Sequence, residues 1–105
     1  MKQIINGKRY DTEKAENIAN AANGCNRDDF NYFDEDLYIT KSGQFFLAGQ
    51  GHAKTKYASK SYDGMRGIGE GIFPLSAAEA QRWLEDNRHT DVLEKYSQYF
   101  EIEEA

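Results

Sequence analysis

The sequence contains one cysteine, Cys25, and only two histidines. A single cysteine cannot form a disulfide within the chain, and this fits a reducing compartment. No apolar run approaches the ~20 residues of a membrane-spanning helix. The first residues, MKQIINGKRYD, also lack the apolar region of a signal peptide. We therefore expect a cytoplasmic protein that does not associate with membranes.

Metal-binding patterns are lacking as well. Cys25, His52 and His89 do not have the paired spacing of a zinc site. The run at 34–36, DED, lacks the glycine and the downstream glutamate of a calcium-binding loop. We therefore predict no bound metal.

The glycine-rich segments do not match nucleotide-binding motifs. GIGEG at 67–71 resembles a phosphate-binding turn, but Ile72 stands where the dinucleotide fingerprint requires a third glycine. Ala53 precedes Lys54, where a P-loop requires glycine. We therefore predict no cofactor and interpret residues 59–71, with four glycines at 64–71, as a flexible surface loop.

Catalytic residues are not evident. Nucleophilic catalysis needs Ser or Cys beside a histidine that a carboxylate orients. His52, next to the glycines at 49 and 51, is the histidine best placed for such a role, although a turn residue without catalytic function is the simpler interpretation. We assign no catalytic residue and keep a small enzyme centred on His52 as an alternative.

The charge is unevenly distributed. Net charge is −5, which opposes non-specific binding to nucleic acid or to anionic membranes and favours a basic protein surface as partner. Residues 37–62 contain no acid and carry +4, which leaves −9 for the rest of the chain. A small nucleic-acid-binding regulator that uses this lysine-bearing window is a second alternative. The four lysines of the window are Lys41, Lys54, Lys56 and Lys60.

Acids flank a group of aromatic side chains just before this window. An acidic patch with aromatic anchors is suited to docking on a basic partner, whereas a merely solvated acidic surface is the alternative interpretation. The predicted partner-binding residues are Asp28, Asp29, Tyr32, Phe33, Asp34, Glu35 and Asp36. A secondary acidic patch is predicted at Glu94, Glu101, Glu103 and Glu104.

The first half of the chain predicts two hairpins and a helix. Asn6-Gly7 is typical of a type I′ turn in a hairpin over 3–10. Alanines at helical spacing predict a helix over 12–23, and the acidic segment 25–36 is predicted to be a loop. Alternating residues predict a central hairpin over 37–48.

The second half of the chain predicts short strands at 56–58 and 72–73, followed by helices. Ser76 and Glu79 form a capping-box pattern, which predicts a helix over 77–87. Thr90 is the predicted cap of a helix over 91–100, and the acidic tail 101–105 is predicted to be frayed. Together these elements predict one α+β domain over 1–105: a mostly antiparallel sheet with about three helices packed on it.

Several phrases resemble a group of small, mostly uncharacterised bacterial and prophage proteins. They are IINGKRYDTEKAE at 4–16, LYITKSGQFFLAGQG at 37–51, KYA at 56–58 and IFPLSAAEAQRWLE at 72–85. The chain departs from the pattern at His52, where a glycine is expected, and in its extra acids at 28–36.

Proteins of mobile elements include anti-CRISPR inhibitors, some of which mimic the charge of DNA. The resemblance permits such an activity, and the charge of −9 outside the lysine window together with the lack of a catalytic pattern favours a non-enzymatic inhibitor or adaptor from a phage or mobile element. Such a protein uses an acidic surface to occupy a basic, nucleic-acid-binding surface of a host effector complex, without binding nucleic acid itself. The sequence makes no prediction about oligomeric state.

Overall fold

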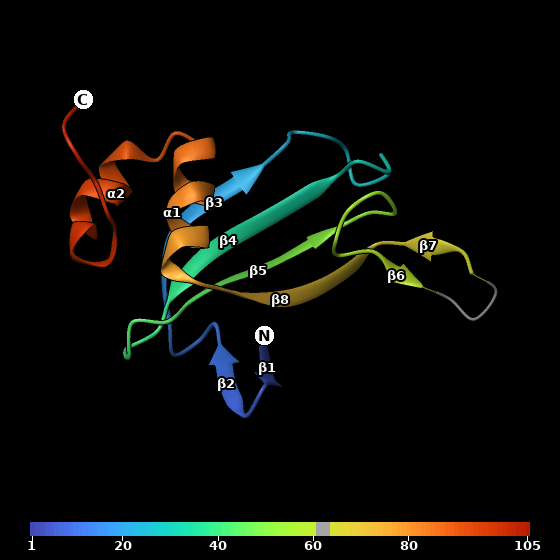
Figure 1. The fold of residues 1–105 in the computed structure, drawn as a ribbon. Coiled ribbons are helices and arrows are strands. Elements are labelled where there is room, and N and C mark those ends of the chain that lie inside the picture. Colours follow the sequence, from blue (N-terminus) through green and yellow to red (C-terminus); the bar gives the residue numbers. More distant parts are fainter. Residues whose placement is uncertain (61–63) are drawn as a thin grey trace.

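A four-stranded antiparallel sheet forms the centre of the computed structural model, which describes residues 1–60 and 64–105 (Figure 1). Helices cover one face of the sheet, which we call the helix face, and an N-terminal hairpin packs on the other, the hairpin face. This arrangement confirms the α+β class. The strands are ordered β3 (Glu16–Ala22), β4 (Phe33–Ile39), β5 (Phe45–Gly51) and β8 (Gly69–Leu75).

The predicted N-terminal hairpin is confirmed. Strands β1 (Lys2–Ile5) and β2 (Lys8–Asp11) pair antiparallel. Asn6 and Gly7 join them with positive φ angles of 51° and 77°, as a type I′ turn requires.

The central hairpin is also confirmed, and its strands are longer than predicted. The turn between β4 and β5 is closed by the amide of Gly43, which donates to the carbonyl of Thr40 at 2.9 Å. Because β4 begins at Phe33, the prediction of a loop over 25–36 is wrong for its last four residues. Their alternating burial continues the pattern of Leu37 and Ile39.

The predicted helix over 12–23 is wrong, because residues 16–22 form edge strand β3. The pairing of β3 with β4 shifts register between Asn17 and Ala19, so that Ile18 is a bulge. The extra residue breaks the two-residue alternation and leaves apolar residues at a spacing that also fits a helix. After the bulge, Ala19 and Ala21 are both buried and show the two-residue alternation of a strand.

The glycine-rich segment is more regular than predicted. Strands β6 (Ser59–Lys60) and β7 (Arg66–Gly67) form a small second ribbon, and β8 begins at Gly69. The prediction of a flexible loop over 59–71 is therefore wrong for these residues, while its residues 61–63 lie outside the described part. The short strand expected at 72–73 belongs to β8, and the one expected at 56–58 does not form.

Two α-helices follow in the described chain, instead of about three. The capping box of α1 (Ala77–Asp86) is confirmed: the Glu79 amide donates to the Ser76 hydroxyl at 3.1 Å, and the Ser76 amide donates to the Glu79 carboxylate at 2.9 Å. Helix α2 (Thr90–Lys95) is shorter than the predicted 91–100, and His89 rather than Thr90 is its N-cap. A 3₁₀ turn, η1 (Ser97–Tyr99), follows it.

The sheet separates two apolar clusters. On the helix face, side chains of the sheet pack against Ala80 and Leu84 of α1 and Leu93 of α2. On the hairpin face, Tyr10 packs edge-on against Phe46, with ring centroids 5.4 Å apart. These clusters occupy the middle and one end of the sheet and leave polar residues at the other end, where β4 begins.

Candidate functional site

Glu35 is a buried carboxylate on the helix face, with only 6% of its surface exposed. Three donors from distant parts of the chain converge on it. The Tyr57 hydroxyl and the Lys56 ammonium approach Oε1 at 2.6 and 2.7 Å. The indole N–H of Trp83 donates to Oε2 at 2.8 Å. Such a cluster satisfies the hydrogen-bonding capacity that a buried carboxylate demands.

The contacts of Glu35 decide its protonation. Burial by itself raises the pKa of the Glu35 carboxyl. The three hydrogen bonds and the positive charge of Lys56 outweigh burial and bring the pKa below its ordinary value, so the group is ionised at neutral pH. Burial and the bond to Glu35 raise the pKa of Tyr57, which keeps its hydroxyl protonated as a donor.

Glycines bring Tyr57 and Lys56 close to Glu35. On the helix face, Gly49 lies beside Glu35 and Gly71 lies beside Gly49 in the register of the sheet. A Cβ at Gly49 would lie 2.7 Å from the Glu35 Cα, and one at Gly71 would contact the Tyr57 ring at 3.9 Å. The segment after β5 therefore packs closely on the sheet at Gly49 and Gly71, where no side chains project from the helix face.

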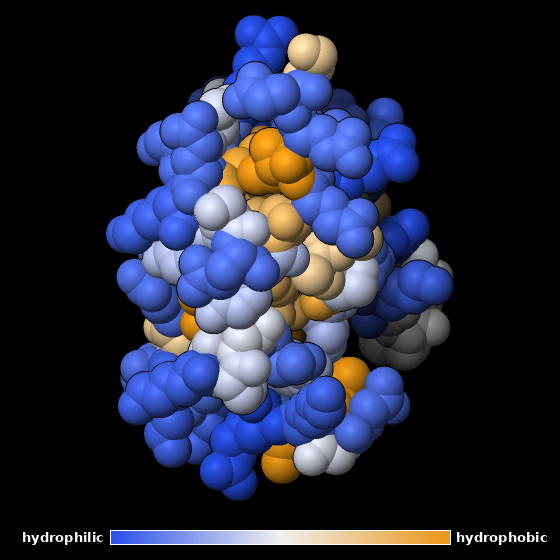
Figure 2. Space-filling view, turned by 60° about the vertical axis from the view of Figure 1, so that its left-hand side comes forward, coloured by the Kyte–Doolittle hydropathy of each residue, from blue (hydrophilic) through white to orange (hydrophobic). Residues whose placement is uncertain are grey.

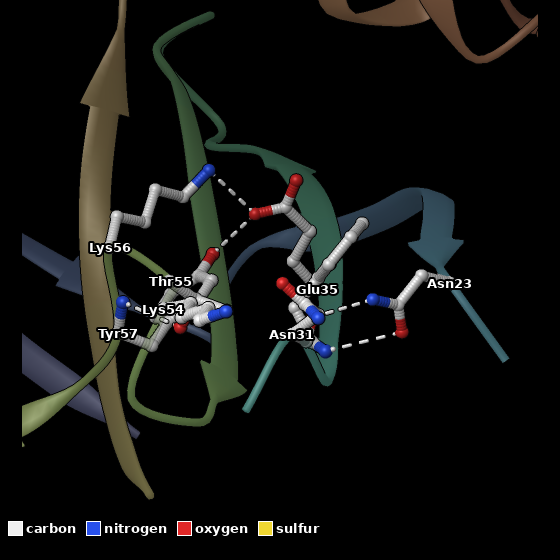
Figure 3. A pocket seen from close by; sticks show the side chains of 8 residues that line it. Asn23, Asn31, Glu35, Lys54, Thr55, Lys56 and Tyr57 are labelled. Carbon is white, nitrogen blue, oxygen red and sulfur yellow. Dashed lines mark hydrogen bonds and ion pairs between the residues drawn. The ribbon is translucent and has the colours of Figure 1, made fainter. Parts of the chain in front are cut away.

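A pocket of ≈ 430 Å³ opens next to this cluster (Figure 3). The Lys56 side chain extends across it toward Glu35 (Figure 3). The Asn23 carboxamide closes one wall by donating to the backbone carbonyl of Asn31 at 2.6 Å. The lining residues are Asn23, Asn31, Phe33, Glu35, Lys54, Thr55, Lys56 and Tyr57.

The hairpin face carries a second polar feature. Asp34 and Asp36 point away from Glu35 because side chains alternate along β4. The Asn20 carboxamide donates to both of them, at 2.8 and 2.9 Å. Glu70 of β8 lies on the same face, across Gln50 from Asp34 in the register of the sheet.

We call Asp34, Asp36 and Glu70 the acidic sheet face. All three line a groove of ≈ 310 Å³ between the sheet and the N-terminal residues. Among the described residues, no lysine or arginine lies within ion-pairing distance of their carboxylates. The groove therefore carries more negative than positive charge. The cationic groups beside it are the N-terminal ammonium of Met1, which donates to the Thr12 hydroxyl at 3.0 Å, and the Arg27 guanidinium, which donates to the Gln50 side chain at 3.4 Å.

The predicted partner-binding patch is divided by the fold. Glu35 is buried, whereas Asp28 and Asp29 lie exposed in the loop before β4. Tyr32 lies beside the acidic sheet face, where its hydroxyl accepts a hydrogen bond from Gln50 at 2.9 Å. Phe33 lines the pocket on the helix face. The acids of residues 28–36 therefore do not share one surface.

The secondary patch lies at the other end of the molecule, with α2 and the C-terminal tail (Figure 1). All four of its glutamates are exposed. The backbone of Glu101 is held to α1, because the Gln81 side chain both donates to its carbonyl at 2.8 Å and accepts from its amide at 3.1 Å. Hydrophilic side chains surround an apolar centre on this side of the molecule (Figure 2).

The lysine window does not form one surface. Lys41 lies in the turn that precedes β5, and Lys54 follows the opposite end of that strand. Seven strand residues separate those ends by roughly 20 Å. Lys56 is already engaged by Glu35.

His52 lies just beyond β5. Its Nδ1 accepts a hydrogen bond from the Ala53 amide at 2.7 Å, and its ring packs 5.0 Å from that of Phe30. Neither contact orients the imidazole as a general base.

Sequence reasoning missed the roles of Tyr57, Trp83, Glu70 and Asn20. The signal for Glu35 was present, since counting back by two from Ile39 and Leu37 places it on the inward face. No comparable local signal indicates Trp83, because 48 residues separate it from Glu35.

Within residues 1–60 and 64–105, no cluster of three or more histidine, cysteine or acidic side chains could hold a metal ion. None of the helices in these ranges has the length and apolar character needed to cross a membrane. Comparisons with protein-family models, curated proteins and solved structures found no match.

Proposed function

We propose that this protein is a non-enzymatic inhibitor or adaptor that docks on a basic surface of another protein through its acidic sheet face. The observation that carries the proposal is the alignment of Asp34, Asp36 and Glu70 along one groove, with no ion pair to any of them among the described residues. Like charges held together on a folded surface cost stability and are relieved by an opposite charge from a partner.

The geometry of the groove supports a protein partner. Its carboxylates project from strands of one sheet, so their spacing is fixed before binding and little ordering entropy is lost. Tyr32 lies at the border of this face, held by Gln50, and supplies an aromatic anchor beside the acids. An arginine or lysine side chain has the charge and length to enter such a groove.

The resemblance to mobile-element proteins narrows the class of partner. A surface that normally holds nucleic acid is basic and would accept fixed carboxylates in place of phosphates. Occupying such a surface would block nucleic-acid binding, as anti-CRISPR inhibitors of the charge-mimicking kind do. The scattered lysines make direct binding of nucleic acid by this protein the weaker alternative.

A charge-reversal experiment tests the proposal. Three tagged proteins are used to capture proteins from a bacterial lysate. They are the native chain, a variant with Asp34→Lys, Asp36→Lys and Glu70→Lys, and a control with Glu94→Lys, Glu103→Lys and Glu104→Lys. Both variants change net charge equally. We expect the first variant to lose captured partner at least about ten-fold and the control to lose little. Quantitative mass spectrometry of the captured proteins and matched urea midpoints provide the readout.

Equal loss in both variants would show that net charge alone drives capture and would contradict the proposal. Unchanged capture by the first variant would contradict it as well. A gel shift at low salt tests the nucleic-acid alternative directly, and we expect no shift at high protein concentration.

A further inference from the structure

The ammonium group of Lys56 occupies a cage on the helix face. It lies 2.7 Å from the Glu35 carboxylate, 5.2 Å from the centre of the Tyr57 ring and 5.6 Å from the centre of the Phe73 ring. The two rings meet edge to face, with centroids 5.3 Å apart. A carboxylate combined with aromatic faces is the arrangement by which proteins bind organic ammonium groups.

The cage does not depend on Lys56 for its shape. Tyr57 and Trp83 hold the two oxygens of Glu35 through neutral donors, at 2.6 and 2.8 Å. The Tyr57 ring rests over Gly71, whose place in the sheet is fixed by pairing with Gly49. Lys56 itself is held less firmly, because 44% of its side chain is exposed.

Space for a ligand adjoins the cage. The pocket of ≈ 430 Å³ begins at Glu35 and Lys56 and extends to the carboxamide of Asn31 and to Lys54. This volume exceeds what an alkyl chain of a few carbons needs. A ligand that displaced Lys56 could therefore keep its body in the pocket while its ammonium replaced that of the lysine.

We propose that this pocket binds an alkylammonium ligand, whose charged group exchanges with Lys56 in the cage formed by Glu35, Tyr57 and Phe73. Lys56 acts as an internal competitor that neutralises Glu35 when the site is empty. The site lies on the face opposite to Asp34, Asp36 and Glu70, so it is independent of the docking surface proposed above.

The sole tryptophan of the chain makes the test direct, since Trp83 donates its indole proton to Glu35. ¹⁵N-labelled protein is titrated with n-butylammonium, and with n-butanol as the uncharged control, while the indole cross-peak is followed. We expect a saturable shift with the amine only. Because a tethered competitor acts at an effective concentration on the order of millimolar, we expect Lys56→Ala to tighten amine binding at least about ten-fold.

Lys56→Gln is the second variant, which retains a polar side chain if the alanine variant folds poorly. Adding Glu35→Gln to either variant removes the carboxylate and should abolish the shift. A second titration uses a blocked tripeptide that contains one lysine. Comparing it with the free amine shows whether the site takes its ammonium group from a protein side chain or from a small molecule. Absence of a saturable shift in a folded Lys56 variant would overturn the proposal. A saturable shift in the Lys56 variants but not in the native chain would also overturn the proposal, because Lys56 would then occupy the cage permanently.

Discussion

The hydroxyl of Tyr57 donates a 2.6 Å hydrogen bond to the carboxylate of Glu35, which lies 22 residues earlier in the sequence. This bond connects the segment that follows β5 to β4, one of the two inner strands of the sheet. It also completes a buried cluster that fixes the ionised state of Glu35. The shape of the pocket therefore depends on a polar contact as well as on apolar packing.

Removing this hydroxyl should destabilise the fold. Hydrogen bonds to charged groups contribute about 1.5–3 kcal/mol, so Tyr57→Phe should lower the free energy of unfolding by about that amount. Urea denaturation provides the measurement. Tyr99→Phe serves as the control, because Tyr99 is 37% exposed and its substitution should change stability by no more than about 0.5 kcal/mol. Equal effects of the two substitutions would contradict a special role for the Tyr57 bond.

The surroundings of Gly49 and Gly71 predict that alanine substitutions at these two positions differ in their effect on stability. A Cβ at Gly49 would lie 2.5 Å from the Asp34 carbonyl oxygen, which is backbone and cannot move without disturbing β4. Gly49→Ala should therefore cost about 1–3 kcal/mol or more through overpacking. A Cβ at Gly71 meets its nearest side-chain atom, of Phe73, at 3.6 Å, an ordinary contact. Thermal unfolding of the two variants is the measurement, and similar melting temperatures would contradict the predicted packing.

The lowered pKa of Glu35 makes stability depend on pH in a defined direction. Ionised Glu35 is favoured more in the folded than in the unfolded chain, so its contribution is present above the ordinary value of 4.5 and is lost as pH falls through the folded pKa. The difference in urea midpoint between the native chain and Glu35→Gln should be constant near neutral pH and shrink below pH 4.5. Asp29 and Glu79, whose pKa values are also lowered, remain in both proteins and cancel in the difference. A difference that grew on acidification would contradict the predicted direction.

Local signals in the sequence predicted local structure correctly. The Asn6-Gly7 turn and the Ser76 capping box each follow from the geometry of a few consecutive residues, and both are present. Strand β3 was mispredicted because the bulge at Ile18 and the small alanines hide the alternation that marks a strand. In that case pairing with β4 overrides the local pattern.

The candidate site depends on contacts that no local pattern contains. Glu35 meets Tyr57 and Trp83 across 22 and 48 residues. The glycines of β8 at 69 and 71 belong to the segment 59–71 that the sequence predicts to be flexible, because the role that they share with Gly49 becomes visible only when the strands pair. The excess of acids was evident from composition, whereas the division of those acids between two faces depends on the register of β4.

The central claim is that Glu35 is buried, ionised and hydrogen-bonded to Trp83, and the indole N–H resonance of Trp83 tests it most directly. The cross-peak is followed by NMR as pH is lowered in the native chain and in Glu35→Gln. We predict that the native resonance titrates with a midpoint below 4.5, the ordinary value for glutamate, and that the variant shows no such titration. A midpoint above 4.5, or the same titration in the variant, would contradict the account.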